Sequence, residues 1–145
     1  KHLQRSNTMA TSTYLSNPTL TVNAVDLSDQ TTSATLTVKY DALESTAFGG
    51  SSRVYTAGLG DHELTVELFM SYAASETYAT LAALVGTATT VIMKPASGAT
   101  SATNPSFTLT GTYLEALPVI DATLGELSSI SLTFRGGVYT VSTSV

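Results

Sequence analysis

Few residues in this chain have types and spacings that could do chemistry. The sequence contains two histidines and no cysteine, so it offers no thiolate metal site, disulfide or thiol nucleophile. His2 lies in the first residues, and His62 stands alone at the start of a predicted strand. A Ser-His-Asp set needs a histidine that is free for proton transfer, and we interpret His62 as structural instead.

The best pair of carboxylates for acid and base catalysis is Glu63 with Glu67, because both fall on one face of the same predicted strand. Four residues of strand separate their backbones by about 13 Å. Glycosidase carboxylates stand only about 5 to 9.5 Å apart. A solvated polar face therefore explains this pair better than a catalytic site.

Two further patterns are weaker. Asp26 and Asp29 could contact calcium, but the remaining ligands of a calcium loop are missing, and turn-forming acids explain them better. The glycines at 49–50 and 58–60 lack the lysine and the strand-to-helix setting of a phosphate loop. We therefore predict no enzyme, no cofactor and no metal.

Composition points toward a hydroxyl-rich β protein. The chain has 145 residues with 43% apolar content, enough for one buried core, and 26 Thr and 18 Ser against only 12% charged residues. Threonine favours strands and serine favours turns. The formal charge of −5 argues against nucleic-acid binding, which needs clustered basic residues. No apolar run reaches the length of a membrane span, so we expect a soluble protein made in the cytoplasm.

Alternating apolar and polar residues predict a mainly β fold, an antiparallel β-sandwich or barrel of about six to eight strands. The predicted strands are residues 19–25, 32–40, 62–70, 89–94, 107–113, 127–135 and 138–141. Helical spacing over residues 72–85, followed by Gly86 as a cap, predicts one flanking α-helix, and residues 96–105 read as a flexible loop. We expect residues 9–145 to form a single domain, and residues 1–8 to be a cloning remnant or a disordered tail.

A long arm separates the second and third predicted strands. Residues 41–61 are too many for a hairpin turn, and loops longer than about 12 to 15 residues in compact domains are normally functional or disordered. If ten residues run out and ten return, the tip stands about 30 Å away. Its apolar residues, such as Phe48 and Tyr55, favour an arm that becomes ordered on assembly over a disordered surface loop.

Two segments carry a resemblance to a known family. Residues 25–87, VDLSDQTTSATLTVKYDALESTAFGGSSRVYTAGLGDHELTVELFMSYAASETYATLAALVGT, resemble the tail tube (major tail) proteins of long-tailed, non-contractile bacteriophages. Residues 99–137, with an Asn-Pro loop, a strand, a spacer and a final strand, resemble the second half of that family. The order of these parts is more specific than any single motif.

The resemblance implies a β-sandwich or barrel with a flanking helix, six copies closing into a ring, and rings stacking into the tube through which DNA leaves the capsid. It implies a place in the virion tail, with tape measure, tail terminator and tail tip proteins as partners. The long arm would then contact neighbouring subunits, through Phe48, Arg53, Val54, Tyr55 and Leu59. Residues 9–18 and 139–145 resemble terminal arms that contact adjacent rings.

Within such a tube, the acidic charge of the chain would keep DNA from adhering to the wall. Six copies of a chain with charge −5 make a strongly acidic ring, and DNA close to an acidic wall is repelled and does not adhere. Glu63 and Glu67 are our candidates for the lumen, with Asp121 and Glu126 as substitutes.

Three alternatives stay open from sequence. A capsid decoration protein or a carbohydrate-binding sandwich could share the β fold, although sugar-binding faces tend to expose several aromatics and the chain has no Trp. A tube protein of a contractile tail or injection machine would share the fold and add a sheath partner.

Overall fold

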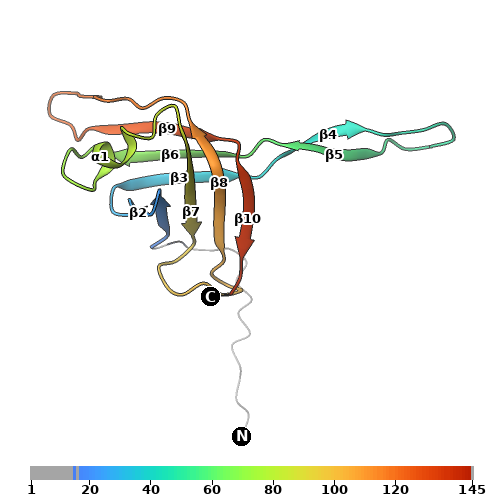
Figure 1. Cartoon of the computed structure of the whole chain (residues 1–145), viewed down its shortest axis with the longest axis horizontal. Helices are drawn as coiled ribbons and strands as arrows, with labels where there is room; N and C mark the ends of the chain where they lie inside the picture. Colours follow the sequence, from blue (N-terminus) through green and yellow to red (C-terminus); the bar gives the residue numbers. More distant parts are fainter. Residues whose placement is uncertain (1–14, 16, 145) are drawn as a thin grey trace, which may run out of the picture.

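The computed structural model describes residue 15 and residues 17–144 of the chain. The predicted remnant at residues 1–8 lies outside the described residues. The described chain forms ten strands and one short helix, and the mainly β, antiparallel class expected from the sequence is confirmed (Figure 1). The elements are β1 (Thr19–Val22), β2 (Val25–Asp26), β3 (Thr31–Thr37), β4 (Tyr40–Glu44), β5 (Tyr55–Gly60), β6 (Glu63–Phe69), α1 (Thr77–Leu81), β7 (Ala88–Lys94), β8 (Ser106–Leu114), β9 (Ser129–Arg135) and β10 (Val138–Ser142).

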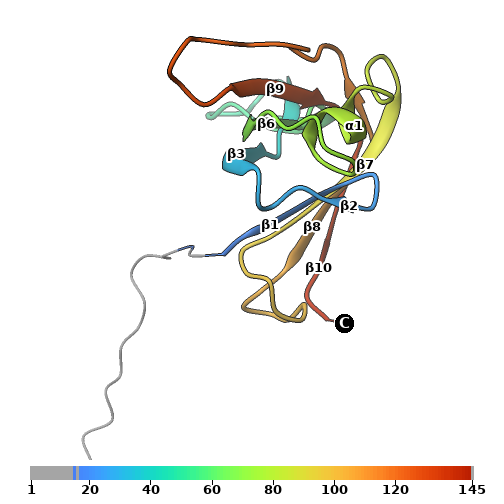
Figure 2. The same ribbon diagram turned by 90° about the vertical axis from the view of Figure 1, so that its left-hand side faces the viewer.

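Eight strands form one sheet in the order β2-β1-β7-β8-β9-β6-β3, with β10 also paired to β8. The sheet turns a corner at β8, whose residues 106–110 pair with β10 while Tyr113 and Leu114 pair with the end of β9. In Figure 1 the β3, β6 and β9 ribbons run across the direction of the β7, β8 and β10 ribbons, and Figure 2 shows the two groups as separate layers. Over the described residues this is an open, folded sheet and not a closed barrel.

The core lies between the two layers and follows the predicted alternation. On β6, Leu64, Val66 and Leu68 are buried while Glu67 and Phe69 on the same strand are exposed. On β9 the buried residues are Ile130, Leu132 and Phe134. Side chains of successive strand residues point to opposite faces, so one face of each strand supplies the core.

The helix is much shorter than predicted. It covers five residues instead of the fourteen with helical spacing, and Ser75 before it has a positive φ of 63°. After Leu81, backbone donors leave the helical pattern: Leu84 N–H bonds to Leu81 O, and Gly86 N–H bonds to Leu114 O. A local turn and then one tertiary bond to β8 therefore replace the helical pattern, although Gly86 keeps the predicted left-handed conformation at φ 78°.

Two other local predictions change. The first strand ends at Val22, because Asn23 and Ala24 both take positive φ in a two-residue turn into β2. The loop predicted to be flexible is organised around buried Asn104, whose Nδ2 donates to the carbonyls of Ala96, Gly98 and Ala99 at 3.1 to 3.2 Å.

The chain's C-terminal part belongs to the body. The segment predicted to be a terminal arm, residues 139–145, contributes Tyr139 to Ser142 to β10, which pairs with β8 along five residues. The N-terminal counterpart, residues 9–18, lies mostly outside the described residues. No helix in the described part of the chain is long and apolar enough to cross a membrane.

Candidate assembly surfaces

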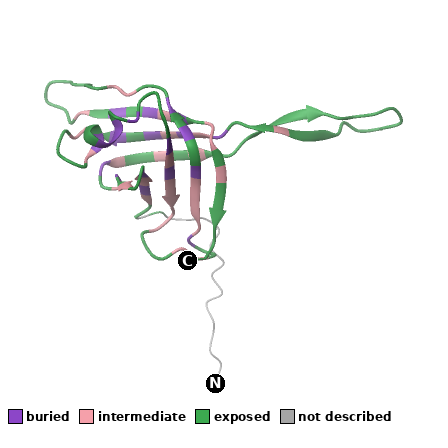
Figure 3. Ribbon diagram, in the orientation of Figure 1, coloured by how far each residue is buried: buried purple, intermediate pink, exposed green. Residues whose placement is uncertain are grey.

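The predicted arm at residues 41–61 is present, and it is an ordered β-hairpin instead of an irregular loop. Strands β4 and β5 form their own two-stranded sheet, which projects from the body (Figure 1). Cα partners run from Tyr40 opposite Gly60 to Glu44 opposite Tyr55, with one register shift near the root. Every residue of the two strands is exposed except Gly58, which is half-buried (Figure 3).

Both faces of the arm carry apolar side chains. Directly opposed residues share a face, so Tyr55 lies on the face of Glu44, whereas Leu43 lies with Thr56 on the other. Phe48 near the tip is fully exposed and Leu59 is 81% exposed. All four apolar arm residues predicted from the sequence are therefore on the surface, and the structure adds two exposed residues, Tyr40 and Leu43.

Polar contacts stiffen the outer half of the arm. Arg53 Nη1 lies 3.4 Å from Glu44 Oε1, with both side chains well exposed. The N–H of Val54 donates to Thr46 Oγ1 at 2.8 Å, and the N–H of Ser45 donates to Val54 O at 2.8 Å. These short-range bonds hold the hairpin together without contacting the body.

The root of the arm is fixed by His62. Its side chain is 2% exposed, and its Nδ1 accepts a hydrogen bond from the N–H of Lys39 at 3.2 Å. Its ring packs edge-on against Tyr40 at 5.0 Å and lies 5.7 Å from Tyr139. His62 thus joins both arm strands to β10, which is a structural use of this residue.

The outward face of β3, β6 and β9 consists mainly of serine and threonine side chains and carries few charges. The register places Ser33 opposite Glu67 and Glu67 opposite Ser131, so Glu67 lies between serines. Glu63 pairs with Arg135, with Oε2 and Nη2 3.3 Å apart. The other two acidic candidates, Asp121 and Glu126, lie in the loop between β8 and β9, so the structure does not bring the four together.

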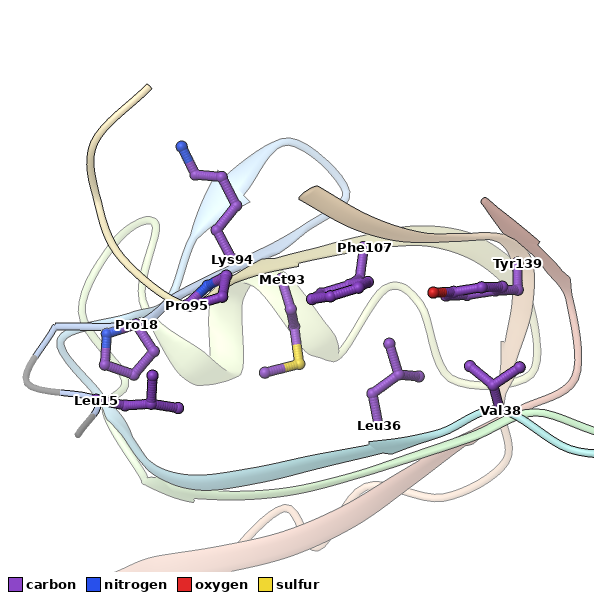
Figure 4. A pocket seen from close by; sticks show the side chains of 9 residues that line it. All are labelled: Leu15, Pro18, Leu36, Val38, Met93, Lys94, Pro95, Phe107 and Tyr139. Carbon is purple, nitrogen blue, oxygen red and sulfur yellow. The ribbon is translucent and has the colours of Figure 1, made fainter. Parts of the chain in front are cut away.

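Two apolar surfaces were not predicted from the sequence. The first is a groove of about 240 Å³ between β3 and the layer of β7, β8 and β10, lined largely by apolar side chains (Figure 4). The lining residues are Leu15, Pro18, Leu36, Val38, Met93, Lys94, Pro95, Phe107 and Tyr139. The groove forms where inward-facing residues of the two layers are not covered by a further strand, which only the sheet order reveals.

The second is the loop of residues 115–128, which we call the far-end loop. Val119, Ile120, Leu124 and Leu127 in it are each more than half exposed. The sequence signal was available, since this segment is richer in apolar residues than the arm. Among the described residues, no cluster of His, Asp or Glu could hold a metal ion.

No protein-family model and no curated protein sequence matches the chain. Solved structures do resemble it. A chain of the sheath/tube terminator of an extracellular contractile injection system gives a TM-score of 0.67 at 12% identity, covering 93% of this chain and 99% of that one. A chain of the sheath-tube complex of such a system gives 0.63 at 10% identity, covering 93% and 94%.

A third similar chain comes from the virion of a native gene transfer agent particle, with a TM-score of 0.62, 9% identity, and coverage of 90% and 99%. All three come from structures of assembled particles, namely contractile injection systems and a gene transfer agent virion. At these identities the likeness concerns the fold. It supports the tail-tube fold implied by the sequence resemblance, without singling out non-contractile tails.

Proposed function

We propose that this chain is a structural subunit that assembles with copies of itself into the stacked, six-membered rings of a phage-like tail tube. The observation that carries the proposal is the arm, an ordered hairpin with exposed apolar side chains on both faces. A two-stranded hairpin is marginally stable alone in water. Chains of similar fold come from assembled tube structures. In such an assembly, neighbouring subunits would cover the arm.

The energetics favour association through the arm. Fully burying one large apolar side chain contributes roughly 1.5 to 3 kcal/mol. Six such side chains on the arm are exposed by half or more, namely Tyr40, Leu43, Phe48, Val54, Tyr55 and Leu59. Association costs an estimated 4 to 15 kcal/mol of translational and rotational freedom. Four of these side chains are only about half exposed, so their burial contributes less than the full value each, and the total is of the same order as the cost of association.

The face of β3, β6 and β9 is our proposed wall of the lumen. Its threonines and serines are uncharged, so they add no ionic attraction for phosphate, and the carboxylate of Glu67 repels phosphate within a Debye length of about 8 Å. Arg135 partly neutralises Glu63, so Glu67 is the stronger of the two candidates. Asp121 and Glu126 lie in the loop between β8 and β9, away from this face.

A tube of a contractile system is a second candidate, and the two similar chains from contractile injection systems favour it. Both candidates share the ring and the arm. They differ in whether the outside of the tube meets a sheath. Co-expression with the products of neighbouring genes, followed by electron microscopy, separates a sheathed tube from a bare one. Tape measure, terminator and tip proteins are proposed partners in either case, and the virion tail is the proposed location.

Replacing residues 45–54 by Asn-Gly tests the proposal. Glu44 and Tyr55 are Cα partners, so a two-residue turn joins them without changing the register. We expect a folded monomer that forms neither rings nor tubes, measured by light scattering after size exclusion and by negative-stain imaging. Ser51→Ala, also in the outer arm, is the control and should assemble normally. Normal tubes from the shortened chain would disprove the role of the arm.

A further inference from the structure

The far-end loop is ordered while presenting its apolar side chains to solvent. The hydroxyl of Tyr72 donates to Val119 O at 2.8 Å, and the N–H of Met70 donates to Ser128 O at 2.8 Å. Within the loop, the N–H of Glu126 bonds to Thr123 O at 3.1 Å. Ordered, exposed apolar segments of this kind mark interaction surfaces.

The far-end loop and the arm lie at opposite ends of the body. Strand β6 begins beside the arm, where Glu63 pairs with Arg135, and ends where Phe69 pairs with Ser129, the residue that follows the loop. Six residues of strand separate these ends by about 20 Å. Figure 1 shows the arm pointing away from the body on the side opposite this loop, so it cannot reach the far-end loop of its own chain.

The charge of the outer part of the arm is complementary to that of the far-end loop, although the arm as a whole is acidic because Asp41, Glu44 and Asp61 lie toward its root. Residues 45–60 of the arm contain one charged residue, Arg53. The far-end loop contains three acidic residues and no basic one. Arg53 is 74% exposed at the side chain and contacts only Glu44, at 3.4 Å, so its present ion pair is weak and an exchange of partner costs little.

We propose that the arm of one copy docks on the far-end loop of the next copy, head to tail. Apolar arm residues cover Val119, Ile120 and Leu124, and Arg53 faces Asp121 or Glu126. This inference rests on the proposed tube function. It adds the surface on which the arm docks and the head-to-tail direction of the contact. Because each copy uses two different surfaces, the contact is heterologous and extends from copy to copy.

Two other acceptors fit less well. Arm-to-arm contact would be self-complementary and would stop at dimers, with Arg53 of both copies in the same interface. The apolar groove is concave, but its one charged lining residue is Lys94, which has the same sign as Arg53. The observations therefore favour the far-end loop.

Cross-linking of introduced cysteines tests whether the far-end loop receives the arm. The chain has no cysteine of its own, so no native thiol reacts. Ser52→Cys in the arm and Ala122→Cys in the loop change exposed residues and leave the apolar contacts intact. Treating the double variant with a short bismaleimide should give a ladder of covalent oligomers. A mixture of the two single variants should give dimers containing one chain of each and no longer species.

The matched control places the second cysteine in the groove by Val38→Cys, combined with Ser52→Cys. A ladder from this pair, or arm-to-arm dimers from Ser52→Cys alone, would overturn the proposal. Rings or tubes that form without any cross-link between the arm and the loop would also overturn the docking proposal, but they would leave the tube function unaffected. Failure of the wild-type chain to associate at all would instead count against the tube function itself.

A charge exchange gives an independent readout. Arg53→Glu should raise the concentration needed for assembly by about two- to fivefold, the range expected for one exposed ion pair. Adding Asp121→Arg and Glu126→Arg to the same chain should restore it. The loop substitutions in an otherwise wild-type chain should weaken assembly. If Arg53→Glu weakens assembly by the same factor with and without the two loop substitutions, Arg53 does not face this loop.

Discussion

The body and the arm are both built from antiparallel β-strands, yet their side chains differ in burial. In the body, fourteen apolar side chains form one buried cluster between the two layers. In the arm, no side chain of β4 or β5 is buried (Figure 3). The apolar content of the arm is therefore not used by its own fold. The contrast teaches that strand propensity alone does not say whether burial comes from the same chain or from a neighbour.

The two regions also differ in how their backbones are held. Each strand of the body pairs with at least one strand of an eight-stranded sheet, whereas β4 and β5 pair only with each other. Thermal or chemical unfolding of the monomer should therefore report on the body alone. Substitutions in the arm should change assembly and leave the unfolding of the monomer almost unchanged.

The largest expected difference between the regions comes from deleting a phenyl ring in each. Phe134 is 1% exposed in the core, and Phe134→Ala should lower the free energy of unfolding by about 3 to 5 kcal/mol. Phe48→Ala, at a fully exposed ring in the arm, should change it by less than about 0.5 kcal/mol. Urea unfolding of both monomers measures this. Similar losses would mean that the arm packs on its own body.

Glycines with positive φ give the next contrast. Gly137, at φ 94° between β9 and β10, would place an added Cβ 2.9 Å from Thr110 O and 3.0 Å from Thr112 N. Gly137→Ala should therefore destabilise the monomer by at least about 1 to 3 kcal/mol. Gly49 at the arm tip has φ 87° but nothing within 4 Å of the same position. Gly49→Ala should leave the unfolding midpoint of the body in place, and an equal shift for both would contradict this view.

The junction between the regions should show an intermediate effect. His62→Leu removes the acceptor for the N–H of Lys39 and should cost about 1 to 2 kcal/mol. His62→Asn keeps an acceptor oxygen near the Nδ1 position and should recover part of this loss. Hydrogen exchange of the Lys39 amide should accelerate in the leucine variant and less so in the asparagine variant. Unchanged exchange would show that His62 does not fix the root.

Much of the body could be predicted from the sequence, because its strands alternate strictly. Alternate residues of β6 and β9 are buried, as the predicted strand pattern requires, since period-two patterning depends only on near neighbours along the chain. The arm was identified because a long apolar segment between two strands has no local explanation. Its hairpin pairing and its two-sided exposure needed the structure.

The remaining features depend on contacts between distant residues. Helical spacing over residues 72–85 competes with the bond from Gly86 to Leu114 O, which no local pattern contains. The order around Asn104 comes from one side chain that bonds three carbonyls of its own loop. The groove becomes a surface only once the sheet order is known, whereas the apolar content of the far-end loop can be seen in the sequence. The assembly contacts and the lumen face stay predictions.

The smallest expected effect concerns the ion pair of the arm in the free monomer. Arg53 and Glu44 are 3.4 Å apart with side chains 74% and 44% exposed, so solvent screens their attraction. A double-mutant cycle with Arg53→Ala and Glu44→Gln should give a coupling of at most about 0.5 kcal/mol in the monomer. In assembly, Arg53→Ala should be more harmful than Glu44→Gln, because only Arg53 exchanges its partner for an acidic residue of the neighbour. Equal effects of the two substitutions on assembly would mean that the pair acts inside the arm, and that the arm is less dependent on its neighbours than its exposure suggests.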